Sequence, residues 1–169
     1  MNTGQTLLSI GALILLGTTI VSVNRMSLQH GTILNQTEIG VYATSLATSI
    51  IEEASGQHFD DATVNDAVTL TSSLTPSSSL GPESGETTVP ASTINFNDFD
   101  DYNNLTLGLN VAGIDSFTVK ASVYYVNDTL PSVKVTSQTW FKRLDVSVYG
   151  TATSDTIKMS YIFSYFNFR

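Results

Sequence analysis

An uncharged apolar stretch near the N-terminus constrains this chain more than any other feature. Residues 7–23 read LLSIGALILLGTTIVSV, and the first charged side chain is that of Arg25. A membrane-spanning helix needs about 20 apolar residues, with a range of roughly 17–25. The stretch lies at the lower end of that range, and the uncharged polar residues before it extend it. We therefore expect residues 1–25 to form a helix that spans a membrane or lies in the core of an assembly.

A cleavable secretory signal peptide is the alternative interpretation of this stretch. Such peptides begin with a positively charged region and end at a small-residue cleavage site. Residues 1–6 carry no positively charged side chain, and no A-x-A pattern follows Val23. The helical pattern continues instead, which favours a retained helix.

Beyond Arg25 the pattern becomes amphipathic. Apolar side chains recur at helical spacing between Met26 and Ala54, namely at Leu34, Ile39, Tyr42, Leu46 and Ile50. Gly56 fits a helix C-terminal stop. We therefore expect one long helix over residues 1–56, whose amphipathic half, residues 26–56, packs on the rest of the chain.

The C-terminal part of the chain alternates between apolar and polar side chains from Phe117 onward. Period two is visible in residues 117–125, 144–148 and 157–163, whereas residues 133–139 fit either a strand or a loop. One apolar face at this period is typical of an antiparallel sheet that is covered on one side. The sequence therefore predicts an α+β fold, in which the long helix packs on a C-terminal antiparallel β-sheet.

The β-rich head is expected to comprise residues 57–169, and it begins with a connector. Residues 71–93 are rich in Ser, Pro and Gly, and they include Pro76, Pro82 and Pro90. Such a composition predicts a surface loop rather than a core segment.

Composition and motifs exclude several function classes. The net charge of −8 argues against direct nucleic-acid recognition, because phosphates attract a basic surface. The chain has no cysteine, so it has no disulfide and no thiolate chemistry. The sequence also has no nucleophile elbow, P-loop or dinucleotide-binding motif, and we expect no enzyme activity.

Residues 95–104, NFNDFDDYNN, form the one concentrated carboxylate cluster in the sequence. Asp98, Asp100 and Asp101 offer hard oxygen ligands, of which calcium takes six to eight. The spacing does not match an EF-hand loop. A calcium site at these three residues is therefore one expectation, with no other cofactor. The alternative is an acidic, solvated turn whose aromatic residues are anchored in the core.

Three Asn-x-Thr sequons are candidate glycosylation sites. They begin at Asn35, Asn104 and Asn127. Such sequons can carry a surface glycan in a secreted protein. The alternative is chance occurrence in a Thr-rich chain.

The predicted arrangement resembles the type IV pilins and pseudopilins. SLATSIIEEA, residues 45–54, looks like the end of a pilin first helix, and NDFDDYNN, residues 97–104, looks like an acidic loop of prepilin-like proteins. WFKRLDVSVYG followed by DTIKMSYIFSY resembles their last hairpin. The resemblance implies a structural subunit of an extracellular helical filament, held in the cytoplasmic membrane as a precursor and assembled by pilus machinery. Filaments of this kind serve adhesion, motility, DNA uptake or secretion.

The resemblance also implies that copies of the apolar helix pack together in the filament core. The residues expected there are Gln5, Leu7, Leu8, Ile10, Gly11, Leu13, Ile14, Leu16, Gly17, Ile20 and Val21. Pilins usually have a glutamate at the fifth mature position, where this chain has Gln5 if Met1 is the first residue. Gly4-Gln5 resembles an archaeal processing site, which would instead make Gln5 the first residue. A minor pseudopilin of a secretion apparatus and a membrane-tethered surface-binding module are the alternative functions.

Overall fold

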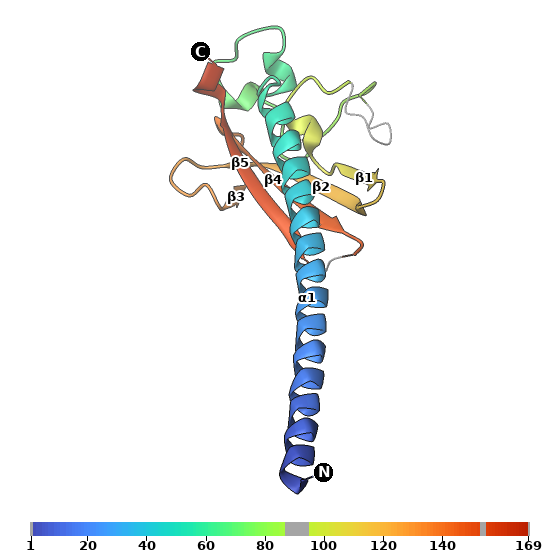
Figure 1. Cartoon of the computed structure of the whole chain (residues 1–169). Coiled ribbons are helices and arrows are strands. Elements are labelled where there is room, and N and C mark those ends of the chain that lie inside the picture. Colours follow the sequence, from blue (N-terminus) through green and yellow to red (C-terminus); the bar gives the residue numbers. More distant parts are fainter. Residues whose placement is uncertain (1, 87–94, 153–154, 169) are drawn as a thin grey trace. The chain divides into compact units, whose positions relative to one another are not determined.

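The fold belongs to the predicted α+β class. A computed structural model describes residues 2–86, 95–152 and 155–168 of the chain. One long N-terminal helix, α1 (Thr3–Ser55), precedes a C-terminal antiparallel sheet of five strands in the described residues (Figure 1). The chain divides into two units, residues 1–38 and residues 39–169. The second unit holds the sheet and the last turns of α1.

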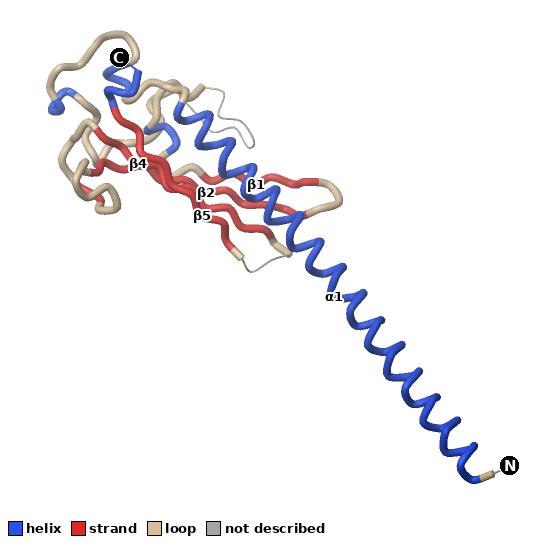
Figure 2. Tube along the Cα trace, turned by 60° about the vertical axis from the view of Figure 1, so that its left-hand side comes forward, coloured by secondary structure: helices blue, strands red, loops and turns tan. Residues whose placement is uncertain are grey.

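The sheet is antiparallel throughout, with the strand order β1-β2-β4-β5 and with β3 paired to β2. Figure 2 shows its strands in red, next to the last turns of α1. The strands are β1 (Thr106–Val111), β2 (Asp115–Val126), β3 (Lys134–Val135), β4 (Phe141–Gly150) and β5 (Thr156–Ser164). Short 3-10 helices flank them: η1 (Asp61–Thr63), η2 (Thr71–Ser73), η3 (Asp100–Tyr102) and η4 (Tyr165–Phe168). The predicted alternation therefore matches β2, β4 and β5. Residues 133–139, which fitted either a strand or a loop, contain only the two-residue strand β3.

One strand lies before the predicted alternation. β1 reads TLGLNV, and of its residues only Leu107 is buried. Gly113 turns the chain from β1 into β2 with a φ of 84°, a conformation that favours glycine. The weak alternation of β1 arises because it is an edge strand with little burial.

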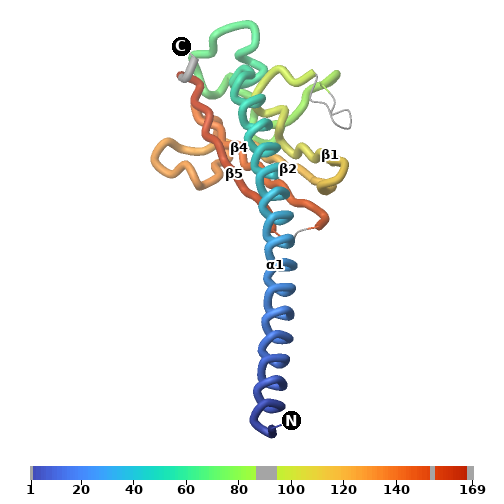
Figure 3. The backbone as a smooth tube through the Cα atoms, viewed as in Figure 1, coloured from blue at the N-terminus to red at the C-terminus, as the bar shows by residue number. Residues whose placement is uncertain are grey.

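A stripe of mostly small side chains on α1 packs on one face of the sheet. Figure 3 shows the backbone of the last turns of α1 running alongside the strands. The buried residues of the helix are Ile39, Ala43, Ala47, Ile50 and Ala54. Their spacing of three and four residues places them on one helix face. Ala47 and Ala54 are 0% exposed, so their small side chains let the helix backbone lie close to the strands. The opposing side chains include Val119 and Val123 of β2 and Leu144, Val146 and Val148 of β4.

The predicted helix stripe is correct in part. Ile39 and Ile50 are buried and Leu46 is half-buried, whereas Leu34 and Tyr42 are exposed. The actual contact stripe is centred on alanines, which contribute little to an apolar pattern that is judged from large side chains. The prediction was therefore wrong for the two exposed residues.

The described part of the connector also differs from the prediction. Leu74 and Leu80 are buried in the core, at 3% and 8% exposure. The expectation that the whole connector stays out of the core was wrong for these two residues. Residues 87–94, which include Pro90, lie outside the described residues.

Ala47→Leu tests the helix–sheet contact. The added methyl groups have no space at a fully buried position, and we expect the free energy of unfolding to fall by about 1–3 kcal/mol. Urea unfolding of the full chain in detergent micelles, followed by circular dichroism, measures this loss. Val41→Leu is the control, because Val41 is 63% exposed and its substitution should change stability by less than about 0.5 kcal/mol. Equal stability of the two variants would contradict the packing.

Candidate functional site

A buried ammonium group lies where β4 meets the loops that follow α1. Lys142 of β4 is 0% exposed. Its Nζ donates hydrogen bonds to the Phe59 carbonyl oxygen at 2.7 Å, to Asp60 Oδ2 at 2.8 Å and to Asp100 Oδ1. Nζ also lies 4.8 Å from the centroid of the Phe59 ring and 5.4 Å from that of Tyr125. A buried charge is tolerated only when it is paired and hydrogen-bonded, and Lys142 meets both conditions.

Asp60 is the well-satisfied partner of Lys142. Its carboxylate accepts hydrogen bonds from the Ala62 and Thr75 backbone N–H groups and from the Thr75 hydroxyl, at 3.0–3.2 Å. The Tyr125 hydroxyl lies 3.1 Å from Asp60 Oδ2. Burial alone raises the pKa of Asp60, but the charge of Lys142 and these hydrogen bonds together lower it below its ordinary value. Asp60 is therefore held as a carboxylate.

The three predicted calcium ligands lie together and are all buried. Asp98, Asp100 and Asp101 are each 0% exposed, so the alternative of a solvated turn is wrong for the carboxylates. The part of that alternative that anchors the aromatic residues in the core is confirmed, because Phe96, Phe99 and Tyr102 are buried there. Asp98 Oδ1 accepts hydrogen bonds from the N–H groups of Asp100 and Asp101, at 2.8 and 3.2 Å. Asp101 Oδ2 accepts from the N–H groups of Asn97 and Asp98, at 2.8 and 3.1 Å. These bonds fold the loop onto η3 and fix the direction of each carboxylate.

The connector adds two carboxylates that the sequence analysis missed. Oxygens of Glu83, Asp98 and Asp100 lie within 4.8 Å of one another, and so do oxygens of Glu83, Glu86 and Asp101. Glu86 accepts hydrogen bonds from the Glu83 N–H at 2.9 Å and from the Asn97 side-chain amide. One signal could have identified them, because they are the only charged residues in the connector.

Burial, together with nearby negative charge, raises several pKa values in this cluster. Burial, followed by the charge of Asp100, raises the pKa of Asp98 to about 9. Burial, followed by a hydrogen bond with Glu86 and the charge of Asp101, raises the pKa of Glu83 to about 8. Burial also raises the pKa of Asp101 to about 6, although backbone hydrogen bonds oppose the shift. A raised pKa means that a carboxyl group holds a proton more readily, so each of these shifts shows that the cluster favours the uptake of positive charge.

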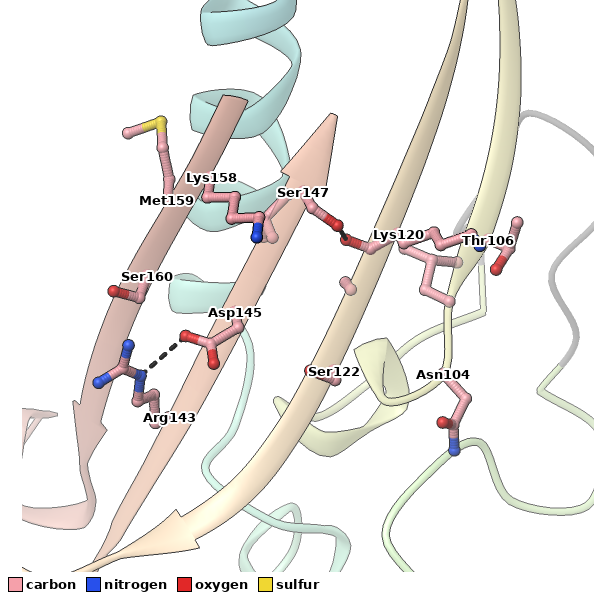
Figure 4. Close-up of a pocket in the computed structure, with 13 residues that line it drawn as sticks. Asn104, Thr106, Lys120, Ser122, Arg143, Asp145, Ser147, Lys158, Met159 and Ser160 are labelled. Atoms are coloured by element: carbon pink, nitrogen blue, oxygen red, sulfur yellow. Dashed lines mark hydrogen bonds and ion pairs between the residues drawn. The ribbon is translucent and has the colours of Figure 1, made fainter. Parts of the chain in front are cut away.

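A second polar surface lies on the face of the sheet that points away from residues 39–55. An open groove there is lined by Lys120, Arg143 and Lys158. These are three of the seven lysines and arginines in a strongly acidic chain. Figure 4 shows Arg143 beside Asp145, whereas Lys120 lies beside Thr106. Arg143 Nε pairs with Asp145 Oδ1 at 2.8 Å, and both side chains are partly exposed. Such a pair contributes at most about 1 kcal/mol.

The predicted glycosylation residues are all accessible. Asn35, Asn104 and Asn127 are exposed. Asn35 lies within α1, and Asn104 has a φ of 61° where η3 leads into β1. Their modification stays a prediction.

Comparisons with family models, with curated proteins and with solved structures found no match to this chain. The function is therefore argued from the residues and their geometry.

Lys142→Met tests the buried charge pair. Removal of the ammonium leaves the Asp60 and Asp100 carboxylates facing each other without their shared partner, and we expect a loss of about 3–5 kcal/mol in the free energy of unfolding. Urea unfolding of the full chain in micelles, followed by Trp140 fluorescence, measures the loss. Adding Asp60→Asn to this variant should restore part of it.

Arg143→Met is the matched control for this substitution. It removes the neighbouring cation, which belongs to the exposed ion pair, and should cost less than about 1 kcal/mol. A Lys142→Met variant as stable as Arg143→Met would show that the buried pair does not hold the domain together.

Proposed function

We propose that this chain is a structural subunit of an extracellular filament of the type IV pilus kind, which waits in a membrane and polymerises through residues 3–25 of α1. The observation that carries the proposal is an apolar helix segment that has no charge before Arg25 and is exposed along its length. Leu8 and Leu13 are 76% and 66% exposed, and Thr6 is the only half-buried residue among residues 2–38. An apolar surface of this extent requires lipid or other protein around it.

The helix is suited to a lipid environment by its length and composition. α1 is long and apolar enough to cross a membrane, a property that a signal sequence shares. The hydroxyls of Thr6, Ser9, Thr18 and Thr19 donate hydrogen bonds to carbonyl oxygens three or four residues earlier, at 2.6–2.9 Å. Polar groups in hydrocarbon need such internal partners. These side chains therefore do not oppose insertion.

The glycines of this segment support close packing between copies of the chain. A Cβ added at Gly4, Gly11 or Gly17 would meet no described atom within 4 Å. Glycine in a helix interior costs about 1 kcal/mol relative to alanine, so the fold of the single chain does not explain the use of glycine at these positions. Small residues let membrane helices approach one another closely. A shallow hollow at Gly11 is lined by Leu7, Leu8, Ala12, Leu15, Leu16 and Thr19.

The proposed core contacts are those of the eleven residues from Gln5 to Val21 that the resemblance implies. All of them are exposed in the single chain. A head-to-tail contact that does not close into a ring generates a helical polymer. Residues 39–169 would then form the outer layer of the filament, with the acidic surface of the chain facing solvent or neighbouring subunits.

A membrane-tethered binding module is the second candidate, and one observation favours it. Three cationic side chains, Lys120, Arg143 and Lys158, line the open groove of an otherwise acidic chain. The groove could bind an anionic surface without any polymerisation. Electron microscopy of sheared cell-surface material separates the candidates, because only the first gives filaments made of this chain.

Two substitutions test polymerisation. Gly11→Leu keeps the segment apolar and leaves the single chain unstrained, but it blocks close helix approach, so filaments should fall at least tenfold in number while the chain stays in the membrane. Leu13→Arg places a charge in the apolar core and should abolish filaments. Filaments are counted by electron microscopy, and membrane content is measured by immunoblotting.

Leu8→Met serves as the matched control in the same segment, because it conserves volume and apolar character. It should give filaments at the wild-type level. Normal filaments from both Gly11→Leu and Leu13→Arg would overturn the proposed function.

A further inference from the structure

The carboxylate cluster contains more acidic groups than its one ammonium group can balance. Asp98, Asp101, Glu83 and Glu86 lie beside the pair that Lys142 makes with Asp60 and Asp100. Among the described residues, Lys142 makes both of the salt bridges in this cluster. Like charges at this separation, away from water, repel strongly. A further positive charge would relieve that repulsion.

Several buried oxygens in the cluster have no hydrogen-bond partner among the described residues. They are Glu83 Oε2, Asp98 Oδ2, Asp100 Oδ2 and Asp101 Oδ1. The other oxygen of each aspartate is occupied, so the side chains are already fixed in place. A buried acceptor without a partner carries a desolvation cost of about 1–3 kcal/mol, and more when it is charged. A bound cation would give these oxygens a partner that the hydrogen bonds of the described side chains do not supply.

The separation of the oxygens suits a single metal ion. Glu83, Asp98 and Asp100 each offer an oxygen within 4.8 Å of the others. Calcium–oxygen distances are about 2.3–2.6 Å, so two ligands on opposite sides of one ion lie up to about 4.6–5.2 Å apart. A separation in this range is compatible with a single calcium ion shared by the three carboxylates.

We propose that Glu83, Asp98 and Asp100 bind one calcium ion. Asp98 and Asp100 are fully buried, and each has an oxygen without a partner. The second group, which contains Glu86, is less suitable because both oxygens of Glu86 already accept hydrogen bonds. Both groups contain Glu83, which makes Glu83 the decisive residue.

The ligand chemistry selects calcium among the common metals. The donors are all carboxylate oxygens, and neither group contains histidine or cysteine. Zinc and copper favour nitrogen and sulfur ligands. Magnesium demands a strict octahedral geometry and keeps several waters, whereas calcium accepts irregular clusters of carboxylates. The bound ion would fasten the connector, through Glu83, to the loop at η3.

Calcium titration of the full chain in detergent micelles tests the site. The protein is first treated with EDTA and dialysed, and CaCl2 is then added in an isothermal titration calorimeter. We expect binding of one calcium per chain and a rise in the unfolding temperature on calcium addition. Glu83→Gln and Asp98→Asn should each weaken binding at least tenfold. Both keep an acceptor oxygen, and both reduce repulsion in the metal-free protein, so these variants should remain folded.

Asp66→Asn is the matched control, because Asp66 is an exposed carboxylate in the segment between α1 and η2. It should bind calcium as the wild type does. Wild-type protein that gives no binding heat and no shift of its unfolding temperature would overturn the proposal, and so would Glu83→Gln that binds with wild-type affinity. An equal response to MgCl2 would overturn the assignment to calcium. Filament formation is not part of this measurement, so the site and the proposed function can fail independently.

Discussion

The cost of burying a charge governs how residues 39–169 are assembled. The ammonium of Lys142 has left water completely, and only well-placed acceptors can offset that loss. Those acceptors come from distant parts of the sequence: Phe59 and Asp60 follow α1, and Asp100 begins η3. One side chain of the sheet therefore fixes the segment that leaves the helix and the loop that precedes the strands. Apolar burial brings these segments together, and the charge pair determines how they align.

The alternation of apolar and polar residues correctly predicted the strands that have one face toward the core and the other toward solvent. β2, β4 and β5 alternate because one face of β2 and β4 is buried and one face of β5 is mostly half-buried. β1 escaped prediction because little of it is buried, and its glycine and asparagine carry no pattern. The predicted contact residues of α1 differ from the observed ones for a related reason. Its contact residues are largely alanines, whose importance comes from their small size and not from a strong hydrophobic signal.

The candidate site was predicted only in part because its determinants are long-range. Local spacing identified Asp98, Asp100 and Asp101, but it could not show that they are buried. The burial of Lys142 could have been predicted, because it lies two residues before Leu144 and so on the same strand face as Leu144, Val146 and Val148. Its pairing with Asp60 was not visible, because 82 residues separate them. Glu83 and Glu86 lie in a stretch without periodicity, where sequence alone gives no indication of which loop they will meet.

The Thr and Ser hydroxyls in the N-terminal part of α1 affect how easily this segment could pass from lipid to a helix assembly. Each of them carries its hydrogen-bond acceptor within the same helix, so its bonding is unchanged whether lipid tails or other helices surround it. If the proposed function is correct, transfer of these hydroxyls from lipid to a helix assembly breaks none of their hydrogen bonds, and side-chain packing contributes most of the free-energy difference between the two surroundings. That difference is small for apolar side chains, so little work would be needed to move the segment in either direction.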